Sequence, residues 1–118
     1  MIADAAHAWK VLTVEQMEEL LTQQVFLGAP VDLADGYIHL STDEQLRGTL
    51  DKHFAGQDNL YLARIDLAAL GSDVKWEPAR GGALFPHIYG PLPLAAVIAH
   101  GALRRRADGS VVPPDQTL

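Results

Sequence analysis

The first apolar segments of the chain change from strand spacing to helical spacing at Thr13. Residues 8–12 predict a first strand. Thr13 and Gln16 then match a capping box, in which each side chain satisfies a free backbone amide at the start of a helix. Apolar residues recur three and four positions apart in the next segment, and acidic residues fill the other helix face. Gly28 and Pro30 end this first unit.

A second unit of the same kind follows a predicted loop at residues 31–36. Residues 37–40 predict a short strand, and the sequence Ser-Thr-Asp-Glu at residues 41–44 predicts a second capping box. Apolar residues spaced by four then continue as far as Phe54, which indicates another amphipathic helix. Gly56 is the expected stop signal for that helix.

Strands predominate in the second half of the chain. Residues 59–65, 74–77 and 94–103 have the apolar content typical of strands, and a short helical turn is expected at residues 67–70. Residues 78–93 are rich in Gly and Pro and predict a long loop. Aromatic and apolar side chains within that loop argue against disorder, and long ordered loops in compact domains are commonly functional.

The predicted order of elements is β-α-β-α-β-β-loop-β, which differs from the regular alternation of a doubly wound sheet. We therefore expect an α+β fold with a mixed or mostly antiparallel sheet and two helices. A chain of 118 residues has the usual size of a single domain, here residues 1–118. We expect its core to span about residues 8–112, with residues 1–7 and 113–118 frayed.

Composition narrows the cellular context. No apolar stretch approaches the roughly 20 residues of a membrane-spanning helix, so no membrane association is expected. The first eight residues contain no Lys or Arg and no long apolar run, so they do not match a secretory signal. The absence of cysteine excludes disulfides and thiol chemistry. The expected location is cytoplasmic.

The charge distribution argues against nucleic acid as a partner. The formal net charge is −6, whereas a protein that grips nucleic acid needs a basic face. The one basic cluster, residues 104–106, lies beside a turn signal at residues 107–110. We interpret it as the solvated rim of a terminal hairpin, with contact to an anionic partner as the alternative.

The segment around His39 is the first candidate for chemistry. If its apolar neighbours point into the core, alternation places Tyr37, His39 and Ser41 together on the opposite face. That face ends at a helix amino terminus, where free amides can bind phosphate or carboxylate. We predict a catalytic role for His39 and ligand binding by Ser41 and Thr42. The alternative is that Ser41 or Thr42 only caps the helix and that His39 is a hydrogen-bonded sheet residue.

The second candidate segment runs through the long loop. Glu77 and His87 are candidate catalytic groups, as a general base or hydroxyl-binding group and a proton carrier. Arg80 would hold phosphate or carboxylate, and Trp76 or Tyr89 would stack on a ring. Alternatively the loop is structural, its aromatic side chains fill its own middle, and Glu77 pairs with Arg80.

A metal site is not predicted. His39, His53 and His87 lack the helical i, i+4 spacing of zinc enzymes, and the chain has no thiolate. His53 is better explained by its place near the carboxyl end of the second helix, where it interacts favourably with the helix dipole.

Several sequence blocks resemble a bacterial domain-of-unknown-function family, number 952. They are residues 35–42, Glu44-Gln45, residues 53–56, Trp76-Glu77 and residues 85–93. In this order they cover the chain from about Trp9 to Leu103. This resemblance implies no activity.

The order of elements is also similar to the ADP-ribosyltransferase-like fold, especially the compact type that modifies rifampin. That resemblance implies NAD as cofactor and a transferase activity. The sequence departs from its pattern, because Lys10 stands where an NAD-anchoring His is expected and His39 where a stacking Tyr is expected. Glu77 is the candidate for the catalytic acidic residue.

Together these patterns predict a site for a small molecule, either a nucleotide or another phosphate-bearing ligand. Its chemistry would be ADP-ribosyl or phosphate transfer. The alternative is a non-catalytic module on the same fold, which binds a metabolite or docks a protein through the same loop. Turnover by the purified protein, abolished by Glu77→Gln, distinguishes the enzyme from the module.

Overall fold

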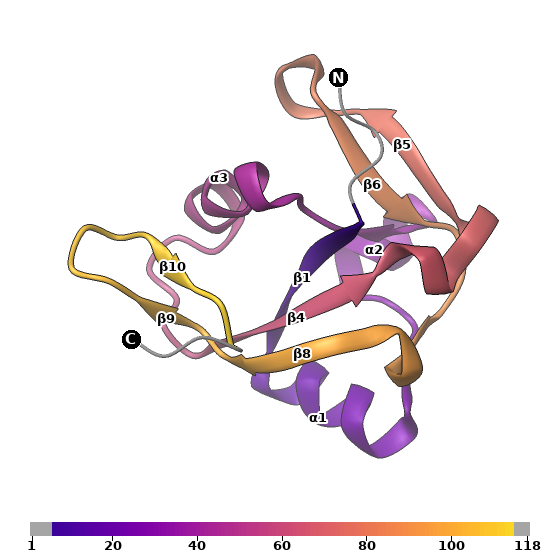
Figure 1. Cartoon of the computed structure of the whole chain (residues 1–118), viewed down its shortest axis with the longest axis horizontal. Coiled ribbons are helices and arrows are strands. Elements are labelled where there is room, and N and C mark those ends of the chain that lie inside the picture. The colour runs from indigo at the N-terminus through magenta and orange to yellow at the C-terminus, as the bar shows by residue number, and fades with distance from the viewer. Residues whose placement is uncertain (1–5, 115–118) are drawn as a thin grey trace.

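A three-stranded antiparallel sheet forms the centre of the molecule, in a computed structural model that describes residues 6–114 (Figure 1). Its strands are β1 (His7–Thr13), β4 (Leu60–Asp66) and β8 (Val97–Ala102), with β4 in the middle. The predicted first strand and the predicted strand at residues 59–65 are confirmed within a residue or two. β1 begins at His7, one residue before the expected core.

Two capped helices cover this sheet. α1 (Val14–Gln23) starts at the predicted capping box, in which Thr13 and Gln16 each bond the other's backbone amide. α3 (Asp43–His53) starts one residue later than predicted, because Thr42 and Gln45 form its capping box. The expected Ser-x-x-Glu pair therefore does not cap α3.

A second three-stranded antiparallel sheet stands beside the first and carries most of the candidate site. It contains β3 (Ile38–His39), β6 (Leu84–Ile88) and β5 (Val74–Pro78), in that order. Two backbone hydrogen bonds between Trp9 and Ser41, of 2.7 and 2.9 Å, join β1 to the chain just after β3. The two sheets are thus connected through the edge of β1.

The residues of β1 and β4 alternate between two parts of the core. Trp9 and Val11 pack with Leu46 and Leu50 of α3. The other face of β1 belongs to a larger cluster that includes Leu12, with side chains from α1 and the second sheet. Both faces of β1 are therefore buried, which explains the high apolar content of this strand.

Several short elements complete the chain. They are β2 (Val25–Phe26) paired with β7 (Leu92–Pro93), the 3₁₀ segments η1 (Leu67–Asp73), η2 (Arg80–Gly82) and η3 (Leu94–Ala96), and a hairpin of β9 (Arg104–Arg105) and β10 (Val111–Val112). The hairpin confirms the predicted setting of the basic cluster. No helix in residues 6–114 has both the length and the apolar character needed to span a membrane.

Two predicted loops contain regular structure. Residues 31–36 lie mostly in a third helix, α2 (Pro30–Asp35), which begins with Pro and ends at Gly36 with a φ of 89°. The predicted loop at residues 78–93 contains β6, whose pairing partners lie far away in the sequence. The coarse α+β, antiparallel class is confirmed, but the expected number of two helices is wrong.

Candidate functional site

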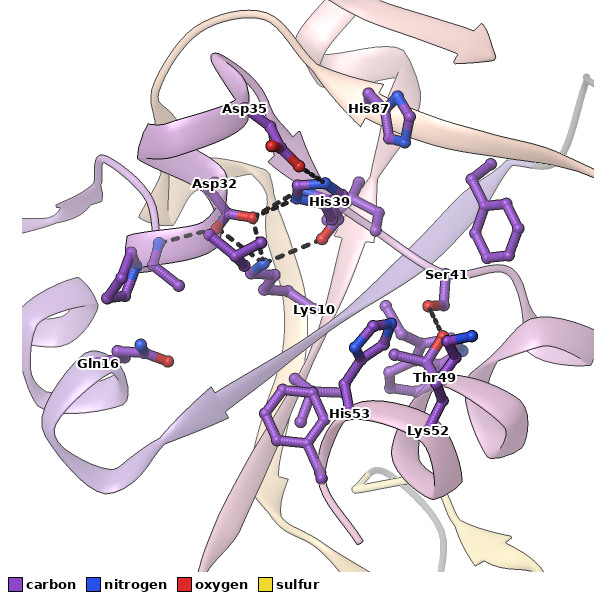
Figure 2. Close-up of a pocket in the computed structure, with 18 of the residues that line it drawn as sticks. Lys10, Gln16, Asp32, Asp35, His39, Ser41, Thr49, Lys52, His53 and His87 are labelled. Atoms are coloured by element: carbon purple, nitrogen blue, oxygen red, sulfur yellow. Dashed lines mark hydrogen bonds and ion pairs between the residues drawn. The ribbon is translucent and has the colours of Figure 1, made fainter. Parts of the chain in front are cut away.

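A cleft of about 590 Å³ opens between α2, β1, the end of β3 and α3 (Figure 2). β1 and the residues after β3 form its floor. His39 and His87 lie on one wall, and Lys52 and His53 of α3 lie on the wall opposite. A cleft of this volume has the size of a small-molecule site.

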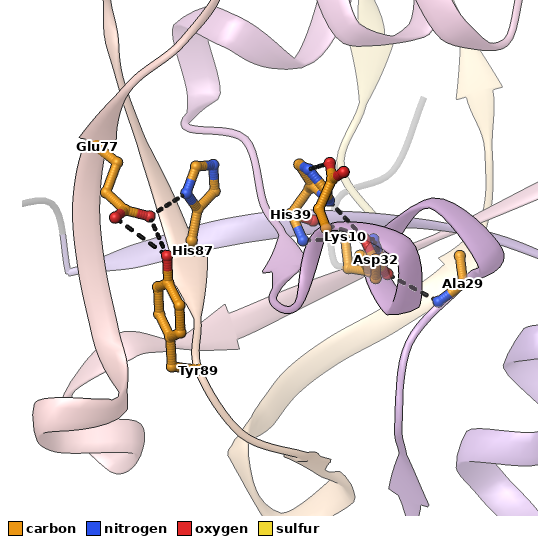
Figure 3. A network of polar contacts seen from close by, with 8 residues as sticks. Lys10, Ala29, Asp32, His39, Glu77, His87 and Tyr89 are labelled. Carbon is orange, nitrogen blue, oxygen red and sulfur yellow. Dashed lines mark hydrogen bonds and ion pairs between the residues drawn. The ribbon is translucent and has the colours of Figure 1, made fainter.

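His39 is fixed by a buried ion pair between β1 and α2 (Figure 3). Asp32 accepts hydrogen bonds from Lys10 Nζ at 2.9 Å, from His39 Nδ1 at 2.6 Å and from the backbone amides of His39 and Ala29. Lys10 Nζ also donates to the carbonyl of His39 at 3.0 Å. Only 6% of Lys10 and 2% of Asp32 is exposed, so both charges depend on these partners.

The charges of this pair support one another. Burial alone would raise the pKa of Asp32, but the hydrogen bond from His39 and the ammonium of Lys10 lower it to about 2. Burial lowers the pKa of Lys10, and the Asp32 carboxylate opposes that shift. Asp32 therefore remains a carboxylate at neutral pH and holds the His39 ring from its Nδ1 side.

Gly28 allows α2 to approach the network closely. Its φ of 130° is unfavourable for residues that have a Cβ, and a Cβ there would lie 3.0 Å from the Cβ of Asp32. The position of Asp32 thus depends on a glycine four residues earlier.

A second carboxylate meets the other nitrogen of the same ring. Nε2 of His39 lies 3.0 Å from Asp35 Oδ2, at the end of α2. The side chain of Asp35 is 44% exposed, in contrast to that of Asp32.

His87 has its own carboxylate partner. Its Nδ1 donates to Glu77 Oε1 at 2.7 Å, and the hydroxyl of Tyr89 donates to the same carboxylate at 2.8 Å (Figure 3). The hydrogen bond from His87, and then that from Tyr89, lower the pKa of Glu77. The hydrogen bond between Tyr89 and Glu77 in turn raises the pKa of Tyr89. Nε2 of His87 points away from Glu77, so it is the ring nitrogen available for proton transfer.

Strand register explains why these groups meet. His39 pairs with His87 across β3 and β6, and Glu77 pairs with Phe85 across β5 and β6. Paired residues project from the same face of a sheet, as do residues two positions apart. Tyr37, at the start of the same face, stacks on His87 with ring centroids 4.1 Å apart.

Hydroxyl groups occupy the floor of the cleft beside α3. Ser41 is 4% exposed, and its hydroxyl lies 2.7 Å from that of Thr49. Ser41 and Thr49 both line the cleft with Phe85. The site thus combines imidazoles, hydroxyls and an aromatic wall.

Not every predicted site residue joins this cluster. Trp76 projects from the opposite face of β5 and packs against the core, because it neighbours Glu77 in an alternating strand. The Thr42 side chain caps α3 and lies outside the cleft lining. The first turn of α3 also carries Asp43 and Glu44, which repel anions. The Arg80 side chain lies outside the part of the chain that the structure describes.

The sequence analysis missed the acidic partners of His39. Asp32 and Asp35 fall in a segment that had been predicted as a loop, three residues apart, which places both on one side of a helical turn. Lys10 was noticed only through the ADP-ribosyltransferase-like resemblance. A lysine inside an otherwise apolar strand is a signal for a buried carboxylate, but the sequence does not say which one.

Metal binding has no support from the described residues. Among residues 6–114, no group of three or more His, Asp or Glu side chains is arranged to hold a metal ion.

One family model and solved structures of one bacterial protein match this chain. A family model described as "Protein of unknown function (DUF952)" matches residues 11–100. The X-ray structure of protein CC0527 from Caulobacter crescentus is 43% identical, with a TM-score of 0.81 over 90% of this chain and 93% of that one. Its solution NMR structure gives a TM-score of 0.77 at 43% identity, over 94% of this chain and 93% of that one. No curated protein sequence matches the chain.

Proposed function

The chain belongs to the DUF952 family of proteins of unknown function, and from its cleft we propose that it binds a small nucleotide or other phosphate-bearing molecule and transfers a proton during its conversion. His87 exchanges the proton, Glu77 orients His87, and His39 contacts the ligand from the adjacent strand. The enzyme would be a transferase that moves an ADP-ribosyl or phosphate group, as the sequence analysis predicts.

One observation carries this proposal: two histidines on one wall of a cleft, each held at Nδ1 by its own carboxylate. The ring centroids of His39 and His87 lie 5.3 Å apart. A carboxylate at Nδ1 fixes the tautomer and the direction of an imidazole, which prepares Nε2 to give or take a proton.

The other groups of the cleft suit a polar ligand with a ring. Lys52 supplies positive charge on the α3 wall, and Ser41 supplies a hydroxyl. Phe85 offers an apolar surface on the histidine side, where a base or sugar can pack. We place the phosphate inside the cleft rather than at the start of α3.

The ADP-ribosyltransferase-like resemblance motivates NAD and ADP-ribose as first ligands. That resemblance implies that NAD contacts the chain at the positions of Lys10 and His39. Lys10 already binds Asp32 and the His39 carbonyl, so we assign the direct contact to His39 alone. An NAD complex of this chain would therefore differ from the pattern that the resemblance implies.

A titration followed by NMR tests the site. Isotope-labelled protein is titrated with NAD, ADP-ribose and several phosphorylated metabolites, and amide shifts are mapped on the sequence. We expect shifts confined to residues 29–41, 49–57 and 84–89. His39→Ala and His87→Ala should each weaken binding about tenfold or more, since a hydrogen bond to a charged group contributes about 1.5–3 kcal/mol.

His100→Ala is the matched control, because His100 is exposed on β8 and lies outside the cleft lining. It should bind ligand as the wild type does. Shifts scattered over the surface, or equal weakening by all three substitutions, would contradict a site in the cleft. The thermal midpoint of each variant separates lost binding from lost folding.

A non-catalytic binding module is the second candidate. It is favoured by the position of Glu77, whose carboxylate bonds His87 and Tyr89 and does not line the cleft. No substrate atom would then meet a free carboxylate at that position. Ligand binding without turnover, in the wild type and in Glu77→Gln alike, would support the module over the enzyme.

A further inference from the structure

The two carboxylates that hold His39 differ in how firmly they are placed. The side chain of Asp32 is 1% exposed and serves four donor groups from three residues. The side chain of Asp35 is 44% exposed, and its contact with Nε2 of His39 is the one ion pair recorded for it among the described residues. One carboxylate is part of the core, and the other lies at the mouth of the cleft.

We propose that Asp35 occupies the place of the ligand's anionic group, and that a phosphoryl or carboxylate oxygen of the ligand displaces it from Nε2 of His39. This inference rests on the proposed function and adds the chemical class that His39 recognises. The ligand group must be an anion, because Nε2 of His39 lies 3.0 Å from a carboxylate oxygen of Asp35 in the structure.

Asp35 can leave its position at small cost. It is the last residue of α2, and Gly36, in the left-handed conformation, follows it. An exposed ion pair contributes little free energy. Breaking one changes an equilibrium constant by a factor of about two to five. A rotation of the side chain into water therefore exposes Nε2 without disturbing Asp32.

The incoming anion takes over the contact with Nε2 of His39 that Asp35 makes in the structure. Once the Asp35 side chain turns away, its carboxylate no longer lies beside Nε2 of His39, while Asp32 still holds Nδ1 of the same ring. Lys10 cannot take the anion, because its ammonium is buried against Asp32 and the His39 carbonyl. Beside Nε2 of His87, Nε2 of His39 is thus a group that this wall of the cleft can offer to an anion.

The test compares anion binding by wild type, Asp35→Asn and Asp35→Ala. Inorganic phosphate, acetate and ADP-ribose are titrated separately, so that phosphoryl and carboxylate groups are distinguished. We expect Asp35→Asn to tighten binding of the preferred anion about two- to fivefold. Adenosine, which has no anionic group, should bind wild type and variant equally.

Carbon and nitrogen NMR signals report the exchange directly. In the wild type, ligand should move the Asp35 Cγ signal to that of a solvated carboxylate, while the Nε2 proton of His39 stays protected. Asp51→Asn is the control for net charge, because Asp51 is exposed on α3 outside the cleft lining. It should leave the dissociation constants unchanged.

Two outcomes would overturn the inference, and they differ in what else they remove. If ADP-ribose shifts cleft amides but Asp35→Asn and Asp35→Ala bind it no more tightly, Asp35 is not displaced and the proposed function stands. If no probe shifts the His39 or His87 signals at millimolar concentration, the inference and the proposed function both fail.

Discussion

Lys10 and Asp32 place opposite charges where the chain has almost no contact with water. Removing two such charges from water is costly, and the pair is tolerable because every partner is in place. Loss of one partner leaves the other buried and uncompensated. The pair also connects β1 to α2 and fixes the His39 ring, so stability and site geometry depend on the same contacts.

Acid should remove this contribution in a defined range. The pKa of Asp32 is about 2 in the folded protein and 3.8 for an ordinary aspartate, so its stabilisation is complete above about pH 4 and lost as pH falls toward 2. A shift of that size corresponds to about 2 kcal/mol. We expect Asp32→Asn to reduce the free energy of unfolding by at least that amount at pH 7.

Urea unfolding of wild type and Asp32→Asn from pH 7 to pH 2 checks this expectation. The difference between the two proteins should shrink below pH 4 and become small near pH 2, where about half of the wild-type carboxyl is protonated. Asp51→Asn, which changes an exposed carboxylate, should show no such pH-dependent difference. A constant difference at every pH would contradict the assigned pKa.

At the scale of elements, neighbouring hydroxyls before α3 have different tasks. Thr42 accepts from the amide of Gln45, and the Gln45 side chain accepts from the amide of Thr42. Ser41, one residue earlier, turns into the cleft floor and bonds Thr49. The helix therefore begins with Thr42, and Ser41 is left to the site.

Substitution by alanine should separate these tasks. Thr42→Ala removes the cap of α3 and should cost about 1 kcal/mol in unfolding free energy, with ligand binding unchanged. Ser41→Ala removes a hydroxyl from the cleft and should weaken ligand binding. Chemical denaturation and the NMR titration measure the two effects. A larger loss of binding from Thr42→Ala than from Ser41→Ala would reverse the assignment.

At the scale of the whole molecule, two small sheets share one connection. The edge of β1 that does not pair with β4 bonds to Ser41 through the backbone of Trp9. α3 packs on one side of this joint, and the larger core cluster lies on the other. A three-stranded sheet whose edge strand β3 has two residues is marginal by itself, so the second sheet should depend on the first.

Hydrogen exchange can show whether the two sheets open together. We expect the amides of Trp9 and Ser41 to exchange only by global unfolding, as slowly as that of Leu62 in central strand β4. The amide of Ser110, in the exposed hairpin turn, provides the fast reference. Faster exchange at Ser41 than at Leu62 would show that the second sheet opens separately.

Much of the candidate site could be located from the sequence, but not the contacts between its residues. His39, His87, Glu77 and Tyr89 were all predicted, because alternation and a conspicuous loop are visible along the chain. Their contacts were not, since the carboxylate of Glu77 reaches His87 across two paired strands. The ADP-ribosyltransferase-like fold and the transferase activity remain predictions.

The sequence alone determined the features that depend on contacts within about four residues. The capping box at Thr13 and the turn of the terminal hairpin are of this kind, because their hydrogen bonds follow local spacing. Tertiary structure decided the rest. Lys10 meets Asp32 from 22 positions away, and short strands such as β3 carry too few residues for alternation to fix their faces. Register with distant strands sets those faces, and burial then selects which charges must pair.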